Sequence, residues 1–102
     1  MISATATVAT EHGWKYVQQL CKHWAHKLDV ELTENKGVVK FDGAVATMTC
    51  DAKGLTVVIE ADGLESVERF EGVVARHLDR FAFREAPLPF AWVVAQGRAA
   101  SS

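Results

Sequence analysis

The chain is poor in cysteine and in net charge, and each shortage excludes a class of protein. Its two cysteines, Cys21 and Cys50, belong to neither a Cys-x-x-Cys motif nor a Cys/His zinc pattern. We therefore expect reduced, buried thiols rather than a disulfide framework. The formal net charge of −2 gives no field that would draw the molecule to nucleic acid, so no nucleic-acid partner is expected.

Long hydrophobic runs are also missing. No window approaches the roughly 20 apolar residues of a membrane helix, and residues 1–8 lack the basic residues and the unbroken apolar run of a signal peptide. We therefore expect a cytoplasmic protein that does not bind membranes. The composition, 49% hydrophobic and 24% charged, is instead typical of a folded domain, and 102 residues suffice to bury a core.

Alternating apolar and polar residues predict several short strands. Turn residues such as Asp42-Gly43 separate neighbouring stretches. Pro87 and Pro89 precede the last stretch and end any helix before it. The predicted strands cover residues 2–9, 30–33, 38–41, 44–50, 55–61 and 90–94.

Two stretches with apolar residues every three or four positions predict amphipathic helices. The first runs from about Glu11 to about Lys27, with Thr10 as its N-cap. The second follows Asp62, which together with Glu65 resembles a capping box, and reaches at least Arg80.

The predicted order is strand, helix, four strands, helix, strand. Short turns between strands favour an antiparallel sheet, and two helices with one apolar face each can both pack on one side of it. We predict a two-layer α+β fold, helix-grip-like or TATA-binding-protein-like, with a ferredoxin-like sandwich carrying an extra hairpin as the alternative. Residues 1–95 would form this single domain, and residues 96–102 a flexible tail.

His77 is the most informative single residue, because helical spacing places it on the apolar face of the second helix, between Phe70 and Phe81. A polar ring in that position needs hydrogen-bond partners. One interpretation is a core histidine bonded to a backbone carbonyl or a carboxylate. The other is a ligand-binding or proton-transferring residue.

A cationic and aromatic edge follows His77 in the sequence. Arg80 and Arg84 lie three and seven positions later, and Phe83 falls off the apolar stripe of the helix. Arginine offers planar two-pronged contacts to carboxylate or phosphate. The alternative is a solvated flank, in which these arginines form salt bridges with Asp79 or Glu85.

His23 and His26 are three residues apart on the first helix, close enough to share a ligand. A metal site would need a third donor, and His77 is the best placed, so these three residues are the candidate ligands of a transition-metal ion. Otherwise we expect no cofactor. No Ser/His/Asp or Cys/His arrangement stands out, which favours a protein that is not an enzyme.

Two segments carry a family resemblance: Tyr16 to Lys27, YVQQLCKHWAHK, and Val73 to Glu85, VVARHLDRFAFRE. With residues 37–41, they resemble the small bacterial family of domains of unknown function numbered two-two-one-eight, over about residues 3–94. Members occur alone or joined to siderophore-interacting flavin-dependent reductases. The resemblance therefore implies a link to iron or siderophore handling, with such a reductase or an iron–siderophore complex as partner.

The sequence leads to a specific expectation about function. We expect an accessory or binding protein of iron–siderophore utilisation that holds an acidic ligand or a partner protein through a patch of histidine, basic and aromatic residues. The alternative is a metal-binding protein or metal-dependent enzyme. The patch comprises His23, His26, Lys27, His77, Arg80, Phe83 and Arg84.

Overall fold

The computed structural model describes residues 1–52, 54–82, 88 and 90–96. Six strands and two helices follow one another in the predicted order. The elements are β1 (Ile2–Val8), α1 (Gly13–Trp24), β2 (Asp29–Leu32), β3 (Lys36–Phe41), β4 (Ala44–Asp51), β5 (Gly54–Ala61), α2 (Leu64–Phe81) and β6 (Val93–Gln96).

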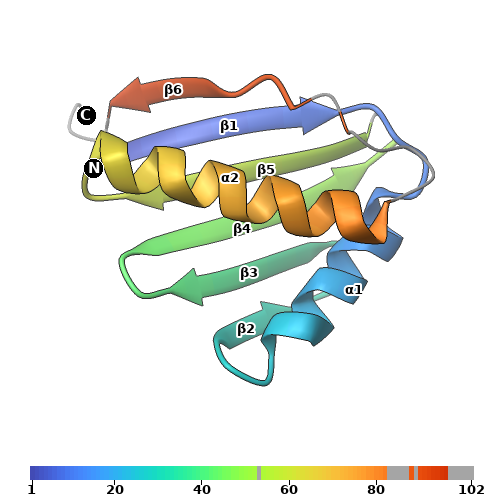
Figure 1. Ribbon diagram of the computed structural model, residues 1–102. Coiled ribbons are helices and arrows are strands. Elements are labelled where there is room, and N and C mark those ends of the chain that lie inside the picture. Colours follow the sequence, from blue (N-terminus) through green and yellow to red (C-terminus); the bar gives the residue numbers. More distant parts are fainter. Residues whose placement is uncertain (53, 83–87, 89, 97–102) are drawn as a thin grey trace.

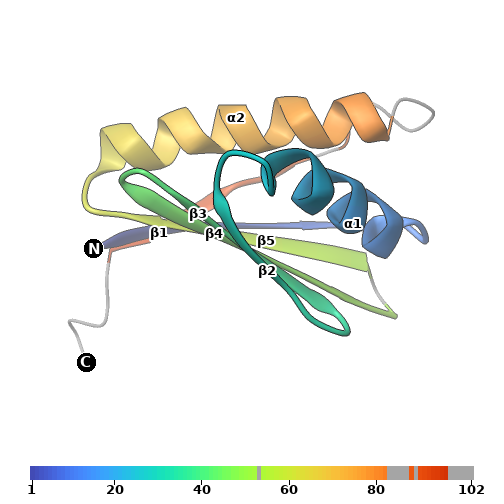
Figure 2. The ribbon, with the colours of Figure 1, turned by 90° about the horizontal axis from the view of Figure 1, so that it is seen from below.

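The strands form one sheet in the order β2-β3-β4-β5-β1-β6, and each neighbouring pair is antiparallel (Figure 1). Both helices lie on the same face of this sheet (Figure 2). The predicted two-layer α+β fold is thus confirmed. The meander β2–β5 lies next to β1 in this sheet, with β2 at one edge and β6 at the other.

The core lies between the sheet and the helices. Every second residue of the central strands points into it, and small residues such as Ala4 and Ala46 let the helices approach closely. Larger side chains fill the remaining space from both layers. The largest fully buried ones include Leu20, Met48, Leu55, Ile59 and Leu78.

The structure corrects the predicted beginnings of both helices. Thr10 is not an N-cap: α1 begins at Gly13, and the Thr10 hydroxyl accepts a hydrogen bond from the His12 N–H at 3.2 Å. Similarly, Gly63 rather than Asp62 precedes α2, without a side-chain cap. A short polar side chain can bond to a nearby backbone group outside the helix instead of capping the helix. Sequence spacing alone does not show which of these two hydrogen bonds forms.

The end of α1 also differs from the prediction. The helix stops at Trp24, whose carbonyl accepts hydrogen bonds from the N–H groups of Lys27 (3.0 Å) and Leu28 (2.8 Å) in a closing turn. His26 and Lys27 therefore lie beyond the helix.

The last strand is later than predicted, because Val93–Gln96 pairs with β1 while Phe90 and Trp92 stack in the segment before it, with ring centres 5.5 Å apart. Strand β6 thus includes Gln96, one residue past the predicted boundary at 95, and residues 97–102 of the predicted tail lie outside the described residues. In the described part of the chain, neither helix combines the length and apolar character needed to cross a membrane.

Candidate functional site

The last turn of α1 packs against the last turns of α2, and this contact brings the two predicted motifs together. The ring centres of His23 and His77 are 5.7 Å apart. Phe81 lies 6.0 Å from His23 in an edge-on arrangement, and Trp24 lies 4.9 Å from His77. Helical spacing explains this meeting, because His77 and Phe81 are one turn apart on the flank of α2 that faces α1.

Further aromatic rings continue the group inward to the sheet. Phe41 of β3 meets Trp24 edge-on at 5.0 Å and Phe70 at 4.7 Å. Aromatic pairs at these spacings add stabilisation beyond the area that they bury. We call the whole group the histidine–aromatic cluster: His23, Trp24, Phe41, Phe70, His77 and Phe81.

The hydrogen bond of His77 fixes which of its nitrogens is available. Nδ1 lies 2.7 Å from the carbonyl oxygen of Val73, one turn earlier on α2. A carbonyl only accepts, so Nδ1 carries the proton and the neutral ring has its free lone pair on Nε2. His77 is half-buried whereas His23 is exposed, so the histidine–aromatic cluster has a covered side and an open side.

Basic residues occupy the ends of both helices. Lys22 and His23 occupy the last turn of α1, and Arg80 occupies that of α2; all three are exposed. The alternative salt bridge from Arg80 to Asp79 is not formed, and the Asp79 carboxylate instead accepts a hydrogen bond from the Leu88 N–H at 2.9 Å. Among the described residues, the salt bridge found is Lys40–Glu31, so none of these three cations is paired with another described side chain.

The other predicted site residues do not join this contact. His26 and Lys27 are exposed in the turn after α1, and no described ring contact links His26 to His77. Phe83 and Arg84 lie outside the described residues. Within the described ranges, no three histidine, cysteine or acidic side chains gather closely enough to hold a metal ion, so a site made of His23, His26 and His77 is not assembled there.

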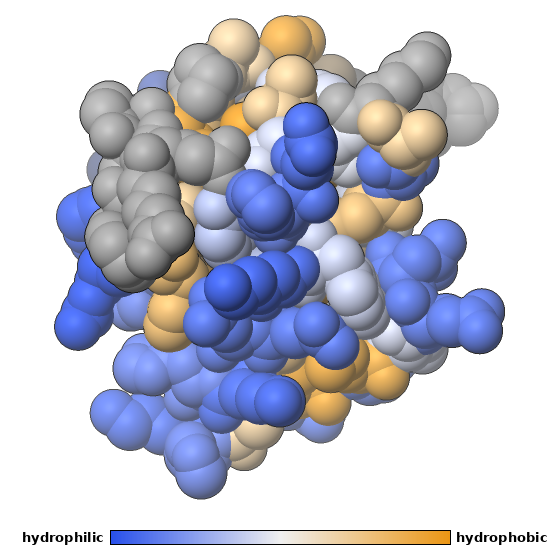
Figure 3. Space-filling view, turned by 90° about the vertical axis from the view of Figure 1, so that its right-hand side faces the viewer, coloured by the Kyte–Doolittle hydropathy of each residue, from blue (hydrophilic) through white to orange (hydrophobic). Residues whose placement is uncertain are grey.

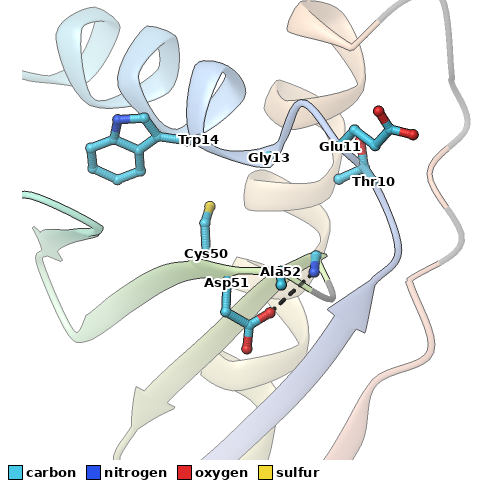
Figure 4. Close-up of a pocket in the computed structure, with 8 residues that line it drawn as sticks. Thr10, Glu11, Gly13, Trp14, Cys50, Asp51 and Ala52 are labelled. Atoms are coloured by element: carbon cyan, nitrogen blue, oxygen red, sulfur yellow. Dashed lines mark hydrogen bonds between the residues drawn. The ribbon is translucent and has the colours of Figure 1, made fainter.

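The start of α1 borders a pocket that the sequence did not reveal. It has a volume of about 300 Å³ and is lined by Thr10, Glu11, Gly13, Trp14, Cys50, Asp51, Ala52 and Gly54. Figure 4 shows the Cys50 thiol pointing toward the start of α1. A side chain at Gly13 would lie 3.1 Å from Leu55 Cβ and 3.3 Å from the Cys50 sulfur, so there is little room at this position for a larger residue.

The Cys50 thiol is not activated in this pocket. Burial, and secondarily the charge of Asp51, raise the pKa of Cys50. The protonated thiol is a poor nucleophile and a poor metal ligand. The Asp51 carboxylate accepts a hydrogen bond from the Gly54 N–H at 3.1 Å (Figure 4), which closes the β4–β5 turn.

The surface at this end of the molecule, where α1 begins and α2 ends, is mainly hydrophilic. Figure 3 shows mostly polar residues on the coloured part of this face, with hydrophobic residues in separate patches. Such a surface suits a polar or charged ligand better than a broad apolar one.

Comparison with known proteins identifies relatives of the chain. A protein of Pseudomonas aeruginosa, PA4090, whose structure was determined by NMR, is 33% identical. The match covers 91% of this chain and 96% of that one, with a TM-score of 0.79. No curated protein matches. The family described as "uncharacterized protein conserved in bacteria", DUF2218, matches residues 5–93, and the chain therefore belongs to this bacterial family.

Proposed function

We propose that the protein is a small, non-enzymatic binding module that holds an acidic ligand, or an acidic segment of a partner protein, between the last turns of α1 and α2. The observation that carries this proposal is the contact between His23 and His77 at 5.7 Å. It joins two motifs that are more than 50 residues apart in the sequence.

The charges around this contact support an anionic ligand. Lys22 and Arg80 are exposed in the last turns of α1 and α2, and arginine binds carboxylate or phosphate through two parallel hydrogen bonds. His77 already donates from Nδ1 to Val73, so an anion at Nε2 would favour the doubly protonated ring, whose Nε2–H then donates to the anion. Phe81 supplies an apolar edge beside His23.

A narrower form of the proposal makes the ligand an iron–siderophore complex or a siderophore-interacting reductase. It rests on the family resemblance, and anionic iron complexes would satisfy the charge requirement. The pairing of the motif residues His23 and His77 supports a shared site but is equally compatible with another acidic ligand.

Titration followed by two-dimensional NMR would test the broader form. Citrate, inorganic phosphate and a ferric tricatecholate complex serve as probes, and the cognate reductase tests the partner. We expect shifts at His23, His77 and Arg80, and Arg80→Gln should weaken binding by at least about tenfold. Lys36→Gln, which removes an equal charge from the distant β3, is the matched control. The proposal fails if none of these probes binds, or if both variants weaken binding equally.

The second candidate function is transition-metal binding, favoured by the orientation of His77. Metal-bound histidines usually donate their other ring N–H to a backbone carbonyl or carboxylate, as His77 Nδ1 does to Val73. Metal–nitrogen bonds of about 2 Å place two imidazoles sharing an ion roughly 5–6.5 Å apart, which includes the observed 5.7 Å. His23 and His77 would supply two of the metal ligands. A bound small molecule or water would supply the remaining ones.

Metal titration of the purified protein distinguishes the two candidates. With Zn²⁺ and Cu²⁺ as probes, His23→Ala and His77→Ala should each lower affinity by at least about tenfold. His26→Ala should have no such effect, because His26 lies in the turn outside the contact. Equal losses in all three variants would instead support the three-histidine site, which is the alternative expected from the sequence. Binding that survives all three substitutions would exclude both metal sites.

A further inference from the structure

One face of the sheet carries no helix in the described part of the chain, because α1 and α2 both cover the other face (Figure 2). On the three strands β3, β4 and β5, the residues of this face alternate with fully buried ones such as Val39, Ala46 and Ile59. We call this surface the open face and define it by Val38, Lys40, Val45, Thr47, Val58 and Glu60.

The strand register arranges the open face in rows. Lys40 pairs with Val45, and Val45 pairs with Glu60, so a lysine and a glutamate flank β4 in one row. Val38 and Val58 similarly flank Thr47 in the adjacent row. Residues directly opposite each other in an antiparallel sheet lie on the same face, about 5 Å apart.

We propose that a second copy of the chain packs on the open face, related to the first by a twofold axis that runs along β4. This axis exchanges the β3 and β5 sides. It therefore places Lys40 opposite the partner's Glu60, and Val38 opposite the partner's Val58, with Thr47 near the axis. Both contacts occur twice, as a self-complementary interface requires. Two sheets packed face to face with nearly aligned strands lie about 10 Å apart. A change in the angle between the sheets moves residues near the axis least, so the contacts made by β3, β4 and β5 depend little on that angle.

Charge also determines the direction of the axis. Lys36 pairs with Thr49, two residues along β3 from Val38. A twofold axis across the strands would place Lys40 opposite the partner's Lys36, and such a meeting of like charges is unfavourable. The axis along β4 is therefore preferred.

Lys40 has an existing partner that this interface retains. Its Nζ lies 3.4 Å from Glu31 Oε2, and the two side chains are 48% and 62% exposed. An ion pair this exposed is weakly held. In the interface, Lys40 would lie between Glu31 of its own chain and the partner's Glu60.

Sedimentation equilibrium of the full chain, from micromolar to about millimolar concentration, would test the proposal together with charge reversals. We expect a monomer–dimer equilibrium. Lys40→Glu and Glu60→Lys should each weaken it by at least about tenfold, because each places like charges opposite one another. The double variant should recover to within about threefold of the original, since the pair is restored with its signs exchanged. Glu68→Lys on the outer surface of α2 is the matched control and should leave self-association unchanged.

A further variant keeps the test decisive if a charge reversal impairs folding, as judged by circular dichroism. Thr47→Glu places two carboxylates near the axis and should abolish the dimer, whereas Thr47→Val should not. A chain that stays monomeric throughout the concentration range would overturn the proposal. A dimer that is insensitive to these substitutions, or whose double variant does not recover, would overturn this interface.

Discussion

His77 connects the stability of the protein to its candidate site. It bonds the Val73 carbonyl and packs against Trp24 and His23. We expect His77→Ala to lower the free energy of unfolding by about 1–3 kcal/mol, through the lost hydrogen bond and ring contacts. Urea denaturation measures this effect, with His26→Ala in the exposed turn as control. Equal stability of both variants and the original would show that the cluster contributes little to the fold.

Glu71 on α2 predicts a specific pH dependence of stability. Its Oε2 is buried without a hydrogen-bond partner among the described residues, and burial, with the nearby Glu68 charge second, raises its pKa. A carboxyl group whose pKa is higher in the folded state binds a proton more tightly there. Its contribution to stability therefore falls as the pH rises from its unfolded pKa, about 4.3, through the raised value.

Glu71→Gln should remove this effect because the amide does not ionise. We expect the variant to gain stability relative to the original protein as the pH rises from 4 to 7, with the difference then becoming constant. Urea denaturation at a series of pH values measures it. Glu34→Gln, in the exposed β2–β3 turn, should leave the pH profile nearly unchanged. A difference between Glu71→Gln and the original that is the same at every pH would contradict the assignment.

Helix α1 approaches β3 so closely that only glycine fits at Gly37. A side chain there would lie 2.7 Å from the Cys21 sulfur and 2.9 Å from Val17 Cγ1. We expect Gly37→Ala to destabilise the protein by about 1–3 kcal/mol, because the helix and strand must move apart. Thermal and urea denaturation both measure this loss.

Gly72, in the middle of α2, provides a control of opposite sign. A side chain there would meet only the flexible end of Arg76, at 3.2 Å, and alanine favours the helix. Gly72→Ala should therefore stabilise the protein by about 0.5–1 kcal/mol. If both alanines destabilise the protein equally, close packing at Gly37 is not the cause.

The elements themselves were largely predictable, whereas their ends were not. Period-two and helical patterns reflect which residues enter the core, so they predicted the order of the six strands and two helices, although the last strand begins three residues later than predicted. Helix ends depend on local hydrogen bonds. The Thr10 hydroxyl accepts a hydrogen bond from the His12 N–H and does not cap α1. The Trp24 carbonyl closes a turn after α1 that leaves His26 outside the helix. Because of this turn, His23 meets His77 whereas His26, the third predicted histidine, does not.

At the scale of the whole molecule, the meeting of His23 with His77 required knowledge of the tertiary structure. The sequence pattern placed His23 on the first helix and His77 on the apolar face of the second, but the sheet order decides how the two helices lie relative to each other. The pocket beside Cys50 was missed for the same reason, because it joins the start of α1 to the β4–β5 turn. Packing between distant segments leaves little local pattern in a single sequence.

The sheet order also predicts how stability is distributed across the molecule. β4 and β5 are paired on both sides and lie under the helices, whereas β2 and β6 are four-residue edge strands with one partner each. Exposed side chains such as Leu32 and Val93 add little burial at these edges. Edge segments with few buried contacts open locally without global unfolding.

Native-state hydrogen exchange measured by NMR would test this distribution. We expect the amides of Ala46, Val57 and Ile59 to exchange only by global unfolding, with opening free energies equal to that from urea denaturation. The hydrogen-bonded amides of β2 and β6 should open with free energies at least about 2 kcal/mol lower. Thr47→Glu, which should be monomeric, is measured alongside the original protein. Any protection that is lost in this variant comes from self-association and not from the stability of the monomer. Full protection of both edge strands in that variant would contradict a stability centred on β4 and β5.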